Sequence, residues 1–225
     1  MIILAVDTAL GACSAALLSG DRVLAHEYRE MARGHAEALA PMVQDMMRRA
    51  ACSFPEVERI GVTTGPGTFA GQRVGLAFAR ALALGLKKPA VGVTTLDVMA
   101  AEALSGHASA AWAVAAADAK RGEIYLGART ANASLLEPEL VPLADAASRL
   151  LSLAGRNGPA MVLAGTAAEA LGPLLRSTGL EPSDSLIRQP DAIFVARLAA
   201  LAPEGPPPRP LYLRPPDAKL PGASP

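Results

Sequence analysis

The order of its apolar segments constrains the fold of this chain more than any other feature, because one order occurs twice. Residues 2–30 contain three short apolar stretches separated by small-residue turns, which predicts three strands. Alternating helical and strand patterns follow as far as residue 104. From residue 112 the chain begins the series again, with three strands, a helix, a strand and a helix. Two successive β-β-β-α-β-α units predict a duplicated architecture of two mixed sheets.

This duplication is the arrangement of the actin, Hsp70 and sugar kinase fold, an α/β fold of the ribonuclease H-like type. We expect an N-terminal actin-like domain over residues 1–105 and a C-terminal one over residues 106–202. Residues 203–225 hold nine of the 19 prolines. Because proline removes a backbone donor and fixes φ, this tail is predicted to lie extended over the surface, and not to form a central strand or a long helix.

The charge balance argues against a chain that holds nucleic acid by itself. Lys and Arg total 21 and Asp and Glu total 21, whereas phosphate-binding surfaces are usually basic. Hydrophobic residues make up 51%, enough for a core, yet no apolar run reaches the roughly 20 residues of a membrane span. The first seven residues end in Asp7 and include no basic residue, so they are interpreted as a strand and not as a signal peptide. A cytoplasmic protein with two reduced cysteines is expected.

The glycine-rich segment from Gly65 to Gly71 is the first candidate for a binding site. It follows a predicted strand and begins a predicted helix, where backbone N–H groups favour an anion. Its glycines would also permit the close approach of a phosphate. A Walker loop, however, ends in Gly-Lys-Ser/Thr, whereas Gly71 precedes Gln72 and Arg73. The alternative is a tight strand-to-helix turn that packs against a neighbouring segment.

Asp7, Asp118 and Gly165 are weaker candidates for contacts to a nucleotide. The two aspartates end the first strand of each unit, where actin-like ATPases place carboxylates near Mg²⁺ and phosphate. Gly165 lies where such proteins place their adenosine-binding turn, but its segment lacks a fuller Gly-Gly run. A strand-end aspartate also caps turns on its own. No cofactor is therefore assigned to the chain itself, and ATP or ADP would bind through a complex that contains it.

The segment from Gly65 to Gly75 also resembles a family signature. Its sequence Gly-Pro-Gly-Thr-Phe-Ala-Gly-Gln-Arg-Val-Gly resembles the Gly-Pro-Gly-Ser-Phe-Thr-Gly-(Leu/Val)-Arg-Ile-Gly motif of the TsaB (YeaZ) family. The residues assigned to this signature loop are Gly65, Pro66, Gly67, Thr68, Phe69, Gly71, Arg73 and Gly75. Five further segments resemble family motifs in the same order: residues 3–9, 35–41, 92–96, 118–125 and 210–214. Thr68 and Ala70 replace the usual Ser and Thr, which removes one hydroxyl from the loop.

The resemblance implies a subunit without catalytic activity of its own. The family forms a heterodimer with its paralogue TsaD, the threonylcarbamoyl transferase, and the TsaE ATPase joins them. Together these proteins attach the threonylcarbamoyl group to adenosine 37 of tRNAs that read codons beginning with A. The resemblance also implies a homodimer that forms through the same surface as the contact with TsaD. The tRNA is expected to be contacted mainly through the complex.

The histidine pattern fits this loss of catalysis. The transferase is expected to hold a metal ion through a His-X-X-X-His helix, in which both imidazoles share one face. Here His35 is followed four residues later by Leu39, and His26 and His107 lie in other predicted elements. We therefore predict no catalytic residue and no metal site, with His35 at a helix start or on the surface.

Two predicted helices, residues 35–50 and 72–86, supply the expected partner surface. Pro41 lies inside the first pattern, so that helix is expected to start or bend there. Methionines give an adaptable apolar surface, and alanines let a second helix approach closely. The residues assigned to the interface are Leu39, Met42, Val43, Met46, Met47, Leu76, Ala79, Arg80 and Ala83. The alternative for these positions is that they pack on the chain's own sheet.

Two other functions remain open on the sequence alone. An actin-like ATPase or kinase acting by itself would use Asp7, Asp118 and the glycine-rich loop. A zinc peptidase-like protein would need metal ligands beyond the single His35.

Overall fold

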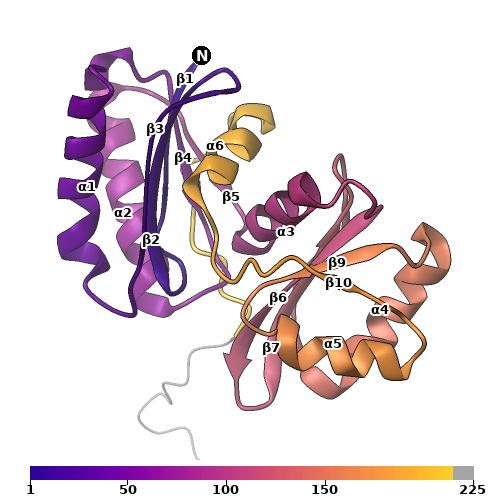
Figure 1. Ribbon diagram of the computed structural model, residues 1–225. Coiled ribbons are helices and arrows are strands. Elements are labelled where there is room, and N and C mark those ends of the chain that lie inside the picture. The colour runs from indigo at the N-terminus through magenta and orange to yellow at the C-terminus, as the bar shows by residue number, and fades with distance from the viewer. Residues whose placement is uncertain (215–225) are drawn as a thin grey trace, which may run out of the picture.

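Two five-stranded sheets form the frame of the molecule (Figure 1), which the computed structural model describes over residues 1–214. The first sheet has the strand order β3-β2-β1-β4-β5 and consists of β1 (Ile2–Asp7), β2 (Ala12–Ser19), β3 (Arg22–Glu30), β4 (Arg59–Thr63) and β5 (Ala90–Val93). The second sheet has the order β10-β9-β6-β7-β8 and consists of β6 (Trp112–Lys120), β7 (Glu123–Arg129), β8 (Ser134–Pro142), β9 (Met161–Ala164) and β10 (Ser183–Asp184).

The two sheets share one topology. In the first sheet β1 pairs antiparallel with β2 and parallel with β4, and in the second β6 pairs in the same way with β7 and β9. In both, a further strand extends the antiparallel side and another extends the parallel side. The duplicated order predicted from the sequence is therefore confirmed. The short strand β10, the counterpart of β5, was not predicted.

The helices lie between these strands and after the last one. Within the described residues they are α1 (His35–Arg49), the short 3₁₀ helix η1 (Phe54–Glu56), α2 (Phe69–Leu86), α3 (Thr95–Gly106), α4 (Leu143–Asn157), α5 (Ala168–Ser177) and α6 (Ala192–Leu201). Side chains of Thr68, Thr94 and Asp191 accept backbone N–H groups at the starts of α2, α3 and α6, which fixes where these helices begin. Helix α1 begins at His35, so Pro41 lies inside the helix and does not start it.

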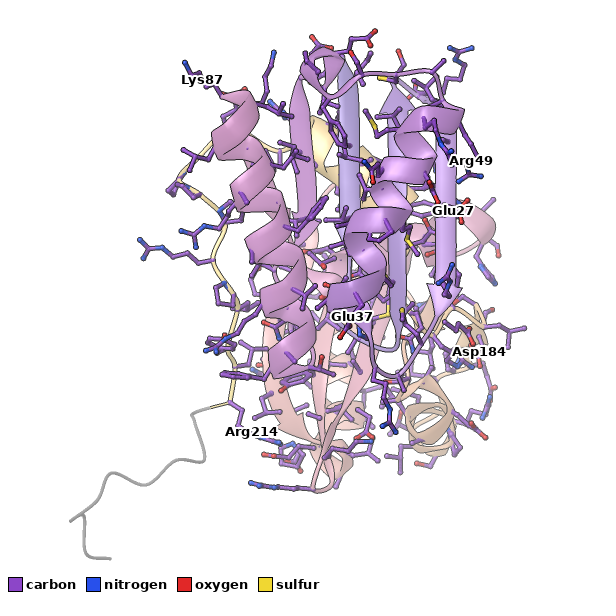
Figure 2. The ribbon with its side chains drawn as sticks, turned by 90° about the vertical axis from the view of Figure 1, so that its left-hand side faces the viewer. Glu27, Glu37, Arg49, Lys87, Asp184 and Arg214 are labelled. Atoms are coloured by element: carbon purple, nitrogen blue, oxygen red, sulfur yellow. The ribbon has the colours of Figure 1, made fainter. Side chains whose placement is uncertain are left out.

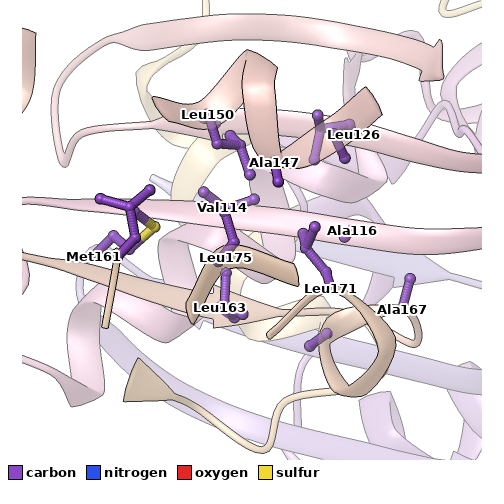
Figure 3. Packing of buried hydrophobic residues seen from close by; sticks show 14 of the residues in the cluster. Val114, Ala116, Leu126, Ala147, Leu150, Met161, Leu163, Ala167, Leu171 and Leu175 are labelled. Atoms are coloured by element: carbon purple, nitrogen blue, oxygen red, sulfur yellow. The ribbon is translucent and has the colours of Figure 1, made fainter. Parts of the chain in front are cut away.

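Each sheet is covered by helices on both faces, which produces four apolar layers. On the first sheet, α1 and α2 cover one face around Leu4, Leu17 and Met46, and α6 covers the other. On the second sheet, α4 and α5 cover one face, where Leu150 and Leu171 are among the buried side chains (Figure 3). Helix α3 covers the opposite face. Burying each such leucine contributes roughly 1.5–3 kcal/mol to folding, so these layers hold the sheets and helices together.

The helices α3 and α6 pack across the boundary expected between residues 105 and 106. Residues 1–105 were expected to form one domain and residues 106–202 the other, which would place α3 with the first sheet and α6 with the second. Instead α3 packs on β6, β7 and β9, and α6 packs on β1, β2 and β4. The physical reason is that α1 and α2 already cover one face of the first sheet, and α6 brings Val195 and Ala199 to the other.

Residues 203–214 form the described part of the tail and link the two sheets. The Leu211 N–H donates to the Thr64 carbonyl oxygen at 2.8 Å, beside the first sheet. Arg214 donates to the Ala119 carbonyl oxygen of β6 at 2.8 Å. This part is neither strand nor helix, as predicted, and residues 215–225 lie outside the described residues. Within residues 1–214, every helix is too short or too polar to cross a membrane.

Candidate functional site

The glycine-rich loop between β4 and α2 packs tightly against the loop that follows β1. The Thr68 N–H donates to the Ala9 carbonyl oxygen at 2.8 Å, and the Thr8 hydroxyl donates to the Gly71 carbonyl oxygen at 2.7 Å. A Cβ at Gly67 would lie 2.3 Å from the Ala9 carbonyl oxygen, and one at Gly71 would lie 2.1 Å from the Thr8 carbonyl oxygen. Both positions therefore need glycine because the chain's own backbone approaches them.

The start of α2 uses backbone donors within the chain. The Gly71 N–H donates to the Thr68 hydroxyl at 3.1 Å, and the Gln72 N–H donates to the Thr68 carbonyl oxygen at 3.1 Å. The carbonyl oxygens of Thr8 and Ala9 that lie against the loop would repel a phosphate. The loop therefore has the geometry of a tight strand-to-helix turn, which is the alternative to a phosphate site.

Asp7 is fully buried at the end of β1. Its Oδ1 accepts hydrogen bonds from the Thr63 hydroxyl at 2.5 Å and from the Ala9 N–H at 3.1 Å. Its Oδ2 has no hydrogen-bond partner among the described residues. Burial raises the pKa of Asp7 to about 7. Burial therefore favours the protonated form of this carboxyl group.

Asp118 and Gly165 have local partners of their own. The Asp118 carboxylate accepts from the Lys120 ammonium at 2.6 Å and from the Lys120 N–H at 2.8 Å, and these hydrogen bonds lower the pKa of Asp118. Gly165 has a φ of 97°, and a Cβ there would lie 2.1 Å from the Ala116 carbonyl oxygen. Asp7 and Asp118 share no hydrogen-bond partner within residues 1–214. The structure thus gives each candidate a structural role.

A group of ionisable side chains that the sequence did not bring together lies where α6 begins. His26 Nε2 is 3.0 Å from Asp191 Oδ2, and the contact with this carboxylate raises the pKa of His26. Burial raises the pKa of Glu102 to about 7. The three residues border a hollow of about 430 Å³.

His35 and the other potential metal ligands form no metal-binding group among the described residues. His35 is the first residue of α1 and is buried. Of the two positions expected for it, the helix start is therefore the one that the structure shows, and not the surface. Across the part of the chain that the structure describes, no group of three or more His, Cys, Asp or Glu side chains is arranged to hold a metal ion.

Most residues assigned to the partner interface lie inside the molecule. Seven of them are buried in the layer between α1, α2 and the first sheet: Leu39, Met42, Val43, Met46, Met47, Leu76 and Ala79. Of the other two, Arg80 is exposed and Ala83 is half-buried. The most regular apolar stripe of a helix faces its own core, which is the physical reason for this burial. The alternative of packing on the chain's own sheet holds for these seven residues.

Figure 2 shows α1 and α2 side by side on the outer face of the first sheet. A groove of about 380 Å³ runs between the two helices and is lined by Ala36, Leu39, Ala40, Arg73, Val74, Ala77 and Phe78. On α2, Phe69 keeps 61% of its surface exposed and Leu84 keeps 81%. Large exposed apolar side chains on one helix mark a surface for macromolecular contact. The sequence predicted a partner surface on these two helices, but of the residues that line this groove it assigned only Leu39 to that surface, because alanines outside the main stripe carry little signal.

Comparisons with known proteins add the family. The family model described as TsaD, tRNA N6-adenosine threonylcarbamoyltransferase, matches residues 25–188. The tRNA threonylcarbamoyladenosine biosynthesis protein TsaB of Escherichia coli K12 is 35% identical over 202 residues, which cover 85% of this chain and 83% of that protein. The chain belongs to the TsaB (YeaZ) family.

Solved structures agree with membership of the TsaB family. The structure of YeaZ from Pseudomonas aeruginosa is 29% identical, with a TM-score of 0.79 over 94% of this chain and 99% of that one. The ROK hexokinase of Thermus thermophilus is 16% identical, with a TM-score of 0.53 over 89% of this chain and 99% of that one, and it shares the fold alone. The predicted duplicated actin-like fold is confirmed by these likenesses together with the two mixed sheets.

Proposed function

We propose that this chain is a non-catalytic subunit of the machinery that makes threonylcarbamoyladenosine at position 37 of tRNA. In this role it binds and activates the TsaD transferase, together with the TsaE ATPase, in the cytoplasm. The groove on the outer face of α1 and α2 carries the proposal, because it is an exposed groove lined mainly by apolar side chains. The local partners of Asp7, Asp118 and the glycine-rich loop support a subunit that acts through contact.

The side chains of the groove suit a helix of the partner. Ala36, Ala40 and Ala77 line it, and such small residues let the backbones of two helices come close together. The opposite faces of α1 and α2 are buried on the first sheet, so this outer face is the side left for a partner.

The TsaD family model supports the choice of partner. Its match to residues 25–188 includes the whole of α1 and α2. A transferase with a similar helix pair could pack it against this pair as a four-helix contact. A second copy of this chain would offer the same pair, so we also propose that self-association uses the same groove and competes with the transferase.

The proposal is tested by filling the groove. We expect Ala40→Arg and Ala77→Arg each to weaken binding to purified TsaD by about ten-fold or more, because a long charged side chain would prevent close helix contact. Calorimetric titration measures the affinity, and formation of threonylcarbamoyladenosine in a reaction with TsaD, TsaE and tRNA should fall in parallel.

The matched control is Ala144→Arg, an exposed alanine on α4 of the second sheet. It introduces the same side chain on a helix surface away from the groove, and its affinity for TsaD should equal that of the unchanged protein. Groove variants that fold normally and still bind TsaD like Ala144→Arg would contradict the proposed interface.

A further inference from the structure

Three exposed side chains near the start of α2, Phe69, Arg73 and Tyr212, hold one another in place. The ring centroids of Phe69 and Tyr212 are 5.7 Å apart, with 26° between the ring planes. The Arg73 guanidinium lies 3.6 Å from the Phe69 ring centroid, and its Nε donates a hydrogen bond to the Tyr212 hydroxyl at 2.9 Å. Stacking, a cation–π contact and a hydrogen bond therefore fix all three.

The tail holds Tyr212 against α2 from both sides. One residue before it, the Leu211 N–H donates to the Thr64 carbonyl oxygen at 2.8 Å. Two residues after it, Arg214 donates to the Ala119 carbonyl oxygen at 2.8 Å and pairs with Glu123. Side chains ordered before association lose less conformational entropy when a partner binds. The cluster is therefore rigid in the way that binding anchors need to be.

The cluster is open to solvent and carries an unbalanced positive charge. Phe69 is 61% exposed and Tyr212 is 45% exposed in spite of their mutual contact. Within residues 1–214, Arg73 contacts a ring and a hydroxyl but forms no ion pair with a carboxylate. Helix α2 contains Arg73 and Arg80 and no acidic residue. A partner surface with an apolar side chain next to a carboxylate would complement this arrangement.

We propose that the Phe69–Arg73–Tyr212 cluster is a preformed anchor for the TsaD transferase. The rings take an apolar side chain of TsaD, and Arg73 takes a TsaD carboxylate. This inference rests on the function proposed above, because Arg73 also lines the groove between α1 and α2 and makes the cluster continuous with it. Aromatic and arginine side chains carry a large share of the binding energy in protein interfaces. The apolar groove and the equal numbers of acidic and basic residues favour a protein over RNA as the occupant.

The test measures binding of the full chain to purified TsaD by calorimetry at low and high salt. We expect Phe69→Ala and Arg73→Glu each to weaken binding by about ten-fold or more. The loss caused by Arg73→Glu should shrink at high salt, because a charge pair at an exposed rim is screened. Tyr212→Phe keeps the ring and removes only the hydroxyl that accepts from Arg73, so a smaller loss of roughly two- to five-fold is expected.

The matched control is Arg156→Glu, which makes the same charge change at an exposed position on α4. This variant should bind TsaD with unchanged affinity. Circular dichroism confirms that each variant is folded. The inference is overturned if Phe69→Ala and Arg73→Glu bind TsaD like Arg156→Glu while the groove variants lose binding. Failure of the unchanged chain to bind TsaD would instead contradict the proposed function. A Phe69→Ala variant that loses affinity for tRNA but keeps its affinity for TsaD would overturn the inference in favour of an RNA contact.

Discussion

Gly71 and Gly85 lie on the same helix in opposite surroundings. A Cβ at Gly71 would lie 2.1 Å from the Thr8 carbonyl oxygen, whereas a Cβ at Gly85 would meet no atom within 4 Å. We expect Gly71→Ala to lower the free energy of unfolding by more than about 3 kcal/mol, because backbone must move to admit the methyl group. Gly85→Ala should raise it by about 0.5–1 kcal/mol, because alanine loses less backbone entropy in a helix. Urea unfolding of the two variants measures both changes.

The comparison of the two alanine variants tests whether glycine is needed at residue 71 because of its close packing, or whether glycine is needed anywhere in this helix. Equal effects at both positions would mean that the close approach to Thr8 does not limit the loop. At this scale the sequence predicted a turn at the glycine-rich loop, from the absence of a lysine after Gly71. It did not predict that Phe69 and Arg73 would meet Tyr212, because these residues are 139 or more positions apart and no local pattern connects them.

Arg59 ties α6 to the strand on which it packs. Its side chain is 12% exposed, and its Nη1 donates to the carbonyl oxygens of Ala199 at 2.8 Å and Ala202 at 3.0 Å, at the end of α6. We expect Arg59→Ala to lower the free energy of unfolding by about 2–3 kcal/mol, because helix-end carbonyl groups lose a charged donor. Arg59→Lys should recover only part of this, because an ammonium cannot reproduce the planar guanidinium geometry. Thermal and urea unfolding would measure the loss.

Arg176→Ala is the control for this pair of variants. Its guanidinium lies 3.9 Å from the Glu181 carboxylate, and both side chains are more than half exposed. Such surface pairs contribute little, so stability should stay nearly unchanged. An Arg59→Ala variant as stable as Arg176→Ala would show that α6 is held by its apolar face alone.

Periodicity in the sequence located the helices and most strands but not the sheets that the helices cover. The pattern over residues 96–104 marks a helix with a buried face, and α3 is indeed found at Thr95–Gly106. An amphipathic pattern predicts that one face of the helix is buried, but it does not predict which sheet that face packs on. For α3 and α6 the neighbouring sheet in the sequence is not the one they pack on. The same limit explains why the apolar stripes of α1 and α2 were assigned to a partner.

At the scale of the whole molecule, the positions of α3 and α6 predict that the N-terminal half of the chain does not fold by itself when the chain is divided after α3. A fragment of residues 1–106 would expose the face of the first sheet that α6 covers. We expect this fragment to unfold without a cooperative transition. A fusion of residues 1–94 to residues 190–214 through a flexible linker supplies the first sheet with α6 and should unfold cooperatively. Heat-capacity measurements on the two chains provide the test.

The outcome of these fragments also decides where the domain boundaries lie. Cooperative unfolding of residues 1–106 alone would show that the first sheet is stable without α6, and would support the division expected from the sequence.

The crossing of α3 and α6 also bears on how the molecule responds to cutting. Two identical single-unit chains that exchanged their last helices would build this same arrangement, so the two halves are arranged like a domain-swapped pair joined in one chain. A protease that cleaves between residues 107 and 111, after α3, would leave two pieces. The α3 helix of the first piece would still pack on the second sheet, and the α6 helix of the second piece would still pack on the first sheet. The nicked protein should therefore stay assembled, with its outer face on α1 and α2 intact.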